Sequence, residues 1–185
     1  MPITRPISRH HPVKSSPFAE YAQAIGWLCM RWTFLEVMVN HLLVVLLDIG
    51  DDEIGRCVTS NIDLRDKFQI ALSVGYIKRI DDQWFEELKV VINIADNELR
   101  EKRNRYAHDF WTFDKSNAMK KIHFRTKMQK SQSRKPIELS TLQETEVLPE
   151  DIWSTADAIS DASGKIALLW SQHRSLTRRR ALRKK

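Results

Sequence analysis

Glycine and cysteine are scarce in this sequence of 185 residues, which has five glycines, six prolines and two cysteines. A β-sandwich or barrel needs a turn every ten residues or so, and five glycines are few for that architecture. Because 42% of the residues are apolar and glycine and proline are rare, the chain is neither collagenous nor globally disordered. Its length fits one domain, or one domain with an insertion.

The sequence also lacks a zinc-ligand motif and a membrane-spanning segment. Cys29 and Cys57 lie in apolar surroundings without a CxxC motif or a Cys/His cluster. We therefore expect no metal site and interpret both as reduced core residues of a cytoplasmic protein. No apolar signal region opens the sequence, and the longest purely apolar run, Leu42–Leu47, is far shorter than the roughly 20 residues that span a bilayer. The sequence thus predicts no transmembrane helix and no membrane partner.

The net charge of +6 is distributed unevenly. Residues 15–114 hold 11 basic and 17 acidic residues, a net charge of −6, whereas residues 115–135 hold eight basic and no acidic residues. Residues 174–185 add seven basic residues. The two basic segments are suited to binding phosphates through counterion release. The alternative for the tail is a solvated helix end, where cations interact favourably with the helix dipole.

Hydrophobic periodicity predicts four main helices with short connections, and hence an all-α bundle. One long helix or two joined helices are expected over 18–49, opened by Ser16 and Pro17. A short helix is expected over 53–59, and longer ones over 64–78 and 83–108. A last helix follows Pro149, which gives a bundle of four to five helices.

The first of these helices carries an unusually large apolar surface. Its apolar residues recur at spacings of three and four: Trp27, Met30, Phe34, Val37, Met38 and His41. The end of the helix is apolar on every side, which predicts that it is buried. In a protein of this size a second subunit can supply one of the burying faces, and His41 is interpreted as a core or interface histidine.

Residues 112–148 interrupt the helical pattern before the last helix. Apolar and polar residues alternate over 121–128 and 136–142, which predicts a polar β-hairpin or an ordered loop. The expected organisation is a flexible basic arm over 1–15, a helical domain over 16–173 and a basic tail over 174–185.

The polar cluster best suited to chemistry lies at the end of the 83–108 helix. Arg103 and His108 are separated by four residues, Asn104 follows the arginine, and Ala107 precedes the histidine. This Arg-Asn-x-x-Ala-His pattern resembles the signature of the HEPN superfamily (higher eukaryotes and prokaryotes nucleotide-binding domains). The resemblance extends over residues 18–111 and weakly over the last helix, and Glu36 resembles the acidic residue that an early helix often places near the motif.

The resemblance implies a small helical bundle that forms a homodimer and acts as a metal-independent endoribonuclease without a cofactor. It implies that Arg103 and His108 are catalytic, that Asn104 and Glu36 support them, and that a two-fold dimer brings two such motifs into one cleft. Family members of this size often serve as toxins in toxin–antitoxin pairs or as phage-defence effectors. RNA is therefore the expected substrate, and an antitoxin protein is an expected partner.

The residue types suit this chemistry. RNA cleaves itself when a 2′-hydroxyl attacks the adjacent phosphate, which requires proton transfer and positive charge on the phosphorane. Histidine titrates near neutrality, and arginine offers a permanently charged fork to phosphate. On an ideal helix, however, Arg103 and His108 point about 140° apart, so they are not expected to make a tight pair unless the arginine reaches round or the helix is ending.

Other basic residues are expected to hold the RNA backbone. They are Arg105, Lys120, Lys121, Arg125, Lys127, Arg178, Arg179 and Arg180.

A second interpretation of the sequence is a non-catalytic HEPN-like module that binds nucleic acid or protein. In that case His108 interacts only with the helix dipole, and Arg105 forms a surface ion pair with Glu101. Glu36 then pairs with Arg31 or faces solvent. A plain helical scaffold with a solvated tail is the third interpretation.

Overall fold

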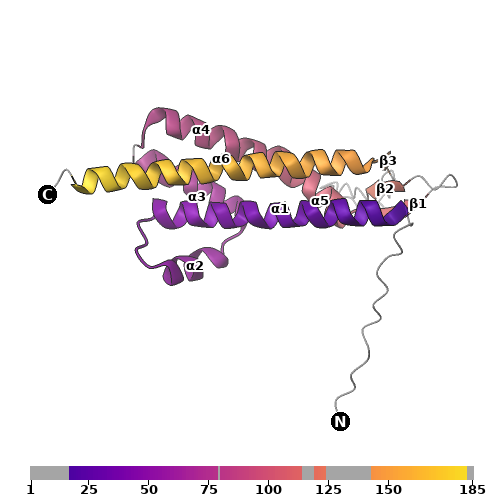
Figure 1. Cartoon of the computed structure of the whole chain (residues 1–185), viewed down its shortest axis with the longest axis horizontal. Coiled ribbons are helices and arrows are strands. Elements are labelled where there is room, and N and C mark those ends of the chain that lie inside the picture. Colours follow the sequence, from indigo (N-terminus) through magenta and orange to yellow (C-terminus); the bar gives the residue numbers. More distant parts are fainter. Residues whose placement is uncertain (1–16, 79, 114–118, 124–142, 183–185) are drawn as a thin grey trace, which may run out of the picture.

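The computed structural model describes residues 17–78, 80–113, 119–123 and 143–182. Two long helices, α1 (Pro17–Leu46) and α6 (Pro149–Leu182), lie side by side along the molecule (Figure 1). They run parallel, because the ring of Trp27 lies 6.5 Å from that of Trp153 and the ring of His41 lies 5.8 Å from that of Trp170. This pair forms one side of the bundle.

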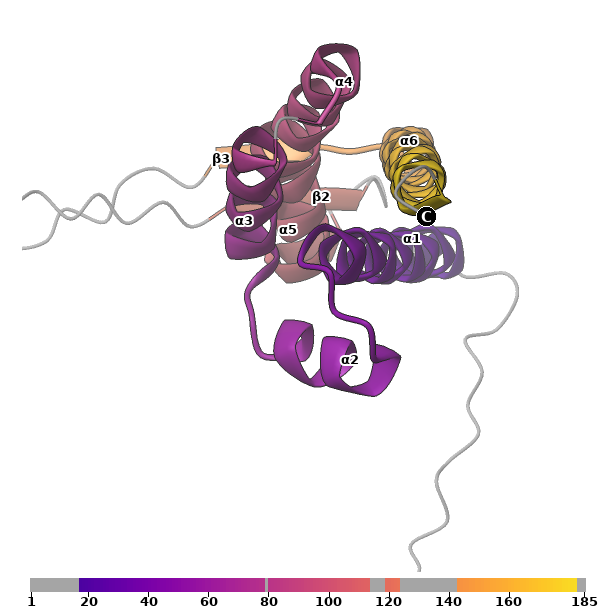
Figure 2. The same cartoon turned by 90° about the vertical axis from the view of Figure 1, so that its left-hand side faces the viewer.

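Further helical segments complete the bundle, and the expected all-α fold is confirmed. The short helix α2 (Asp52–Ser60) lies on the side of α1 away from α6 (Figure 2). Helix α3 (Leu64–Ile77) packs against α1, and α4 (Asp82–Asn93) packs against both α3 and α6.

Aspartates begin three of these helices, as their short polar side chains favour. Asp51 accepts hydrogen bonds from the backbone N–H groups of Glu53 and Ile54 at the start of α2. Asp63 caps α3, and Asp81 caps α4. The predicted cap residue of α1, Ser16, lies outside the described residues.

The single helix expected over 83–108 has a more complex form. After α4, a π-helical segment η1 (Ile94–Leu99) leads directly into α5 (Arg100–His108). The backbone N–H of Arg100 donates to the carbonyl of Ala95, five residues earlier. Such a turn is equivalent to one extra residue in an α-helix, and apolar periodicity does not predict it.

The core lies between α1, α6 and the α3–α5 side of the bundle. Helices α4 and α6 bury large apolar side chains in this core, among them Trp84, Leu88, Ile152 and Ile159. The core-facing residues of α1 are Ala24, Leu28, Trp32, Leu35, Val39, Leu42, Leu43 and Leu46. They are not the residues singled out by spacing, most of which are exposed. At the end of the helix, where burial was predicted, Leu42, Leu43, Val44 and Leu46 are buried and Leu47 is exposed.

Neither cysteine is a core residue, which corrects the interpretation from sequence. Cys29 is half-buried on α1, and Cys57 is exposed on α2. His41 is also exposed in the single chain, although its ring contacts Trp170.

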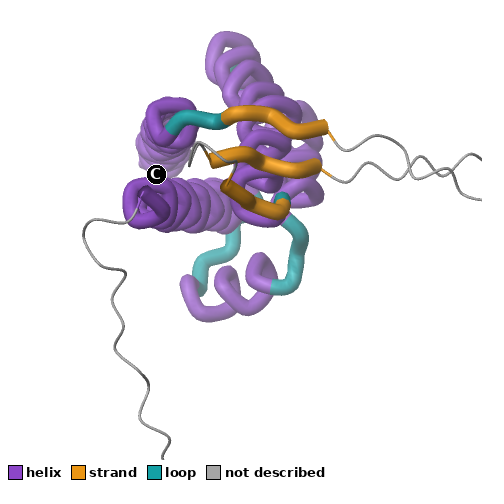
Figure 3. The backbone as a smooth tube through the Cα atoms, turned by 90° about the vertical axis from the view of Figure 1, so that its right-hand side faces the viewer, coloured by secondary structure: helices purple, strands orange, loops and turns teal. Residues whose placement is uncertain are grey.

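A small sheet stands where a hairpin or loop was expected. Strands β1 (Phe110–Phe113), β2 (Met119–His123) and β3 (Gln143–Glu146) form an antiparallel sheet in that order. The sheet lies at the end of the bundle where α5 ends and α6 begins (Figure 3). The strand predicted over 121–128 overlaps β2, β1 was not predicted, and the strand predicted over 136–142 lies outside the described residues.

Helix α1 is long and apolar enough to cross a membrane by length and composition alone, over Phe18–Leu46. Core helices of soluble proteins pass the same test. In this structure Leu28, Leu35 and Leu42 of α1 are fully or almost fully buried inside the bundle. The side chains of α1 that remain exposed include Trp27, Met30, Phe34 and Val37.

Candidate functional site

Arg103, Asn104 and His108 form one contact cluster on α5. Nη1 of Arg103 donates a hydrogen bond to Oδ1 of Asn104 at 3.0 Å and lies 3.3 Å from Nε2 of His108. The helical geometry separates the Cα–Cβ directions of Arg103 and His108, but the long arginine side chain reaches round the helix. Arginine and histidine therefore meet within one chain, at the point where α5 ends.

The ring of Trp32 on α1 packs against the guanidinium of Arg103. Its ring centroid lies 5.6 Å from Cζ of Arg103, within the range of a cation–π contact. The indole is only 4% exposed, and its Nε1 donates to Oε1 of Glu36 at 2.9 Å. Glu36 thus reaches the cluster through Trp32. In the part of the chain that the structure describes, it forms no ion pair with Arg31, which lies over Trp27 instead.

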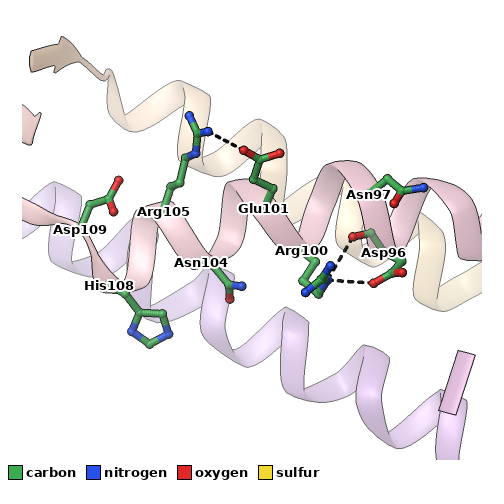
Figure 4. A pocket seen from close by; sticks show the side chains of 8 residues that line it. All are labelled: Asp96, Asn97, Arg100, Glu101, Asn104, Arg105, His108 and Asp109. Atoms are coloured by element: carbon green, nitrogen blue, oxygen red, sulfur yellow. Dashed lines mark hydrogen bonds and ion pairs between the residues drawn. The ribbon is translucent and has the colours of Figure 1, made fainter. Parts of the chain in front are cut away.

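An open groove of about 690 Å³ runs along η1 and α5 (Figure 4). Asn104 and His108 point to one side of α5 and Arg105 and Glu101 to the other. The groove is lined by these four residues together with Asp96, Asn97, Arg100 and Asp109. The motif residues Asn104 and His108 are both among its lining residues, whereas Arg103 is not.

Ion pairs already neutralise two of the arginines along the groove. Arg100 Nε lies 2.8 Å from a carboxylate oxygen of Asp96, and Arg105 pairs with Glu101. Arg103 has no ion pair among the described residues, and its Nε is buried without a hydrogen-bond partner there. The arginine beside His108 therefore has no carboxylate partner among the described residues that an incoming anion would have to displace.

The structure places the residues expected to bind RNA at both ends of the bundle. Lys120 and Lys121 lie on β2, opposite Glu146 and Thr145 of β3, at the same end as the last turn of α5. Arg105 lines the groove but is paired with Glu101, as the second interpretation of the sequence anticipated.

The basic tail is remote from the groove. Arg178, Arg179 and Arg180 belong to the last turns of α6, at the opposite end of the molecule from the sheet (Figure 1). Arg125 and Lys127 lie outside the described residues. A single short RNA segment at Arg103 therefore does not reach all the predicted binding residues.

Aromatic side chains that were not predicted as part of the site fix the end of α5. Nε1 of Trp111 donates to the carbonyl of Tyr106 at 3.1 Å, and the two rings are stacked with centroids 6.4 Å apart. Burial raises the pKa of the Tyr106 phenol, although a hydrogen bond with Thr155 acts in the opposite direction. Tyr106 is therefore a neutral, structural residue near pH 7. Trp32 and Glu36 are four residues apart on one helix, and this spacing was the only signal for their contact.

No group of three or more histidine, cysteine, aspartate or glutamate side chains suited to a metal ion occurs within the described ranges. The cluster nevertheless offers an imidazole and an amide that both contact one guanidinium. A scan against protein-family models and searches of curated proteins and of solved structures found no match for this chain.

Proposed function

We propose that the protein is a metal-independent endoribonuclease of the HEPN type, acting at Arg103 and His108. The observation that supports this function is the contact of 3.3 Å between Nη1 of Arg103 and Nε2 of His108, beside an open groove. His108 lines this groove and Arg103 contacts it from beside the groove, so a phosphate of a bound RNA chain would have to approach His108 to meet both groups. Asn104 stabilises the arginine in this position.

The reaction needs no group beyond the RNA and these side chains. His108 takes the proton of the 2′-hydroxyl, whose oxygen attacks the adjacent phosphorus, and can return a proton to the 5′-oxygen as the P–O5′ bond breaks. Arg103 stabilises the negative charge of the phosphorane through its guanidinium. The products are a 2′,3′-cyclic phosphate and a 5′-hydroxyl.

The biological role that we propose follows from the resemblance to the HEPN superfamily. The protein acts as a toxin or phage-defence effector in the cytoplasm, under the control of an antitoxin protein. The basic segments, including Lys120 and Lys121 on β2, hold the RNA backbone. Their contribution weakens with rising salt, since phosphate contacts release counterions.

Incubation of the purified protein with mixed RNA in EDTA tests the proposal. Arg103→Ala and His108→Ala should each slow cleavage by about 100-fold or more, as expected for loss of a proton-transfer or phosphate-stabilising group. Lys89→Ala is the matched control, because it removes one cation from a surface ion pair with Glu86 on α4. The control variant should cleave at the wild-type rate.

Analysis of the fragment ends decides between the alternatives. Fragments ending in 2′,3′-cyclic phosphate, absent with both site variants, support the endoribonuclease. RNA that binds to the folded wild-type protein without being cleaved supports a non-catalytic binding module. Cleavage that persists in both variants places the activity elsewhere and refutes the proposed site.

A further inference from the structure

Two neighbouring apolar side chains stand in water where α3 ends. Tyr76 is 73% exposed and Ile77 is 75% exposed, more than any other large hydrophobic side chain among the described residues. The ring of Tyr76 lies 6.1 Å from that of Phe85 on α4, centroid to centroid. We call Tyr76 and Ile77 the apolar tip. A single exposed apolar side chain is ordinary, so the surroundings of the tip decide what it means.

The apolar tip lies at the end of the bundle from which the basic tail extends. Lys78, directly after the tip, forms an ion pair with Asp48, which follows α1. The ring of Trp84 on α4 lies 5.7 Å from that of His173 on α6. From His173, α6 continues for nine more residues to Leu182, about 13 Å of helix, toward the end opposite the sheet (Figure 1). The tip and the tail therefore belong to the same end of the molecule.

This end of the molecule carries an excess of positive charge. Residues 174–185 hold seven basic and no acidic residues. Residues 47–60 and 76–82, which are close to the tip, hold six acidic and three basic residues, so the sum is +4. Asp82 is one of these acids and is exposed at the first residue of α4. The surface around the tip is therefore suited to an anionic partner.

We propose that this end of the molecule docks on an anionic lipid surface, with the apolar tip in the bilayer interface and the arginines of the tail against headgroup phosphates. Peripheral binding of this kind combines buried apolar area with electrostatic attraction. Clusters of four to eight basic residues are typical of it, and tyrosine is enriched at the membrane–water interface. An RNA base can stack on Tyr76, but Ile77 beside it has no such partner in RNA.

Docking at the tip leaves the candidate site accessible. The groove runs along η1 and α5 toward the sheet, away from the end of α6 (Figure 1). The contact is peripheral, so it does not need the spanning segment whose absence led to the expectation of no membrane partner. It takes the tail out of the RNA-binding surface and leaves Lys120 and Lys121 to hold the RNA backbone. It is independent of the proposed cleavage activity.

Cosedimentation of the full chain with lipid vesicles tests the inference. The wild type should bind phosphatidylcholine vesicles that contain about 30% phosphatidylserine at least about 10-fold more tightly than pure phosphatidylcholine vesicles, and salt should reduce this preference. Ile77→Gln should weaken binding to the anionic vesicles about 10-fold, because it removes an apolar side chain from the interface. Val90→Gln, at a side chain 57% exposed on α4, is the matched control and should bind as the wild type does.

Charge variants test the contribution of the tail. Replacing Arg178, Arg179 and Arg180 together by glutamine should weaken binding to the anionic vesicles about 100-fold, at roughly fivefold for each cation near the surface. Asp82→Asn should strengthen the same binding by up to about fivefold, because it removes a charge that the anionic lipids repel. Circular dichroism establishes that each variant is folded.

Three results would overturn the inference. The first is a wild-type chain that does not sediment with the anionic vesicles even at low salt. The second is a folded Ile77→Gln chain that binds them as tightly as the wild type, since the tail then adsorbs by charge alone and the tip has no role. The third is a wild-type chain that binds single-stranded RNA but no vesicles, and loses the RNA when the three arginines are replaced, which would assign the tail to nucleic acid.

Discussion

Replacement of Trp32 tests whether α1 positions the arginine of the site. The indole ring lies beneath the guanidinium of Arg103, at 5.6 Å from Cζ, and is itself held by Glu36. Trp32→Leu removes both the ring and its hydrogen bond. The Arg103 side chain then loses its support on the α1 side and spends less time beside His108.

The contact geometry sets the size of the effect. A cation–π contact contributes about 0.5–2 kcal/mol, and 5.6 Å is close to its limit of about 6 Å, so about 1 kcal/mol is appropriate here. If all of it is felt in the transition state, Trp32→Leu lowers kcat about fivefold. Trp32→Phe retains a ring and should lower kcat about twofold. Because Arg103 acts on charge that develops during the reaction, kcat should fall more than KM changes.

Single-turnover cleavage of a labelled RNA, at a temperature where every variant is folded, measures this effect. Trp84→Leu is the matched control, because Trp84 is 3% exposed, donates its Nε1 proton to the carbonyl of Leu169, and has its ring 5.7 Å from that of His173 on α6. Both substitutions remove a buried indole and should lower the melting temperature. Only Trp32→Leu should lower kcat.

The positioning role is refuted if the two tryptophan variants lose the same fraction of kcat. It is also refuted if Trp32→Leu cleaves at the wild-type rate while its melting temperature falls. In either case Trp32 is a core residue that happens to lie near Arg103. Glu36→Gln provides a second readout, because the amide oxygen still accepts from Trp32 and the variant should retain most of the activity.

Three further substitutions test the packing of the bundle. Gly55→Ala should lower the free energy of unfolding by about 1–3 kcal/mol in urea titrations, because its Cβ would lie 2.7 Å from Cγ2 of Val44, and Val44→Ala should partly restore it. Gly164→Ala should raise that free energy by about 0.5–1 kcal/mol, since a Cβ there meets nothing within 4 Å. Burial raises the pKa of Tyr106 above 10.0, so the folded chain keeps a proton that the unfolded chain loses, and stability falls as the pH rises past that value. In urea titrations at pH 8 to about 11, Tyr106→Phe should flatten this fall.

Helix boundaries were predictable because their causes are local. Asp63 is followed by an apolar helical pattern, and its carboxylate accepts from the N–H of Arg65, two residues later. Pro149 opens α6 for a similarly local reason, since its fixed φ suits the first helical position. Neither signal depends on how the chain folds back on itself.

The orientation of α1 was not predictable, because α1 is apolar on nearly every side. Leu28, Leu35 and Leu42 recur every seven residues and face the core. Trp27, Phe34 and His41 recur with the same period and are exposed. Two such stripes are equivalent in sequence, and only the packing of α6 and α3 distinguishes them.

The sequence left open whether Arg103 reaches round the helix to His108, for a different reason. The angle of about 140° describes the directions in which the two side chains leave the helix. It does not describe a guanidinium at the end of a long side chain, which the ring of Trp32 and the amide of Asn104 hold beside the imidazole. The contact with Trp32 joins residues far apart in sequence, so the residue pattern within α5 cannot predict it.

The π-helical turn before α5 also determines where Arg103 points. A π turn accommodates one residue more than an α-helix, so residues after η1 lie about 100° behind the positions that a regular helix would give them. Deleting the exposed residue Asn97 should close η1 into a regular α-helix and leave Arg103 facing Trp32. Glu87 is an exposed residue of α4. Deleting it instead should rotate the helix between Leu88 and η1 by about 100° about its axis, which would expose Leu88 and Val91.

We therefore expect the Asn97 deletion to fold with a free energy of unfolding within about 1 kcal/mol of the wild type, and to retain cleavage if the proposed function holds. The Glu87 deletion should lose most of its cooperative unfolding transition, because it removes large apolar side chains from the core. Urea titrations followed by circular dichroism compare the two. If both deletions are equally destructive, the register of α5 depends on the wide π turn itself, and the bulge is not a simple insertion.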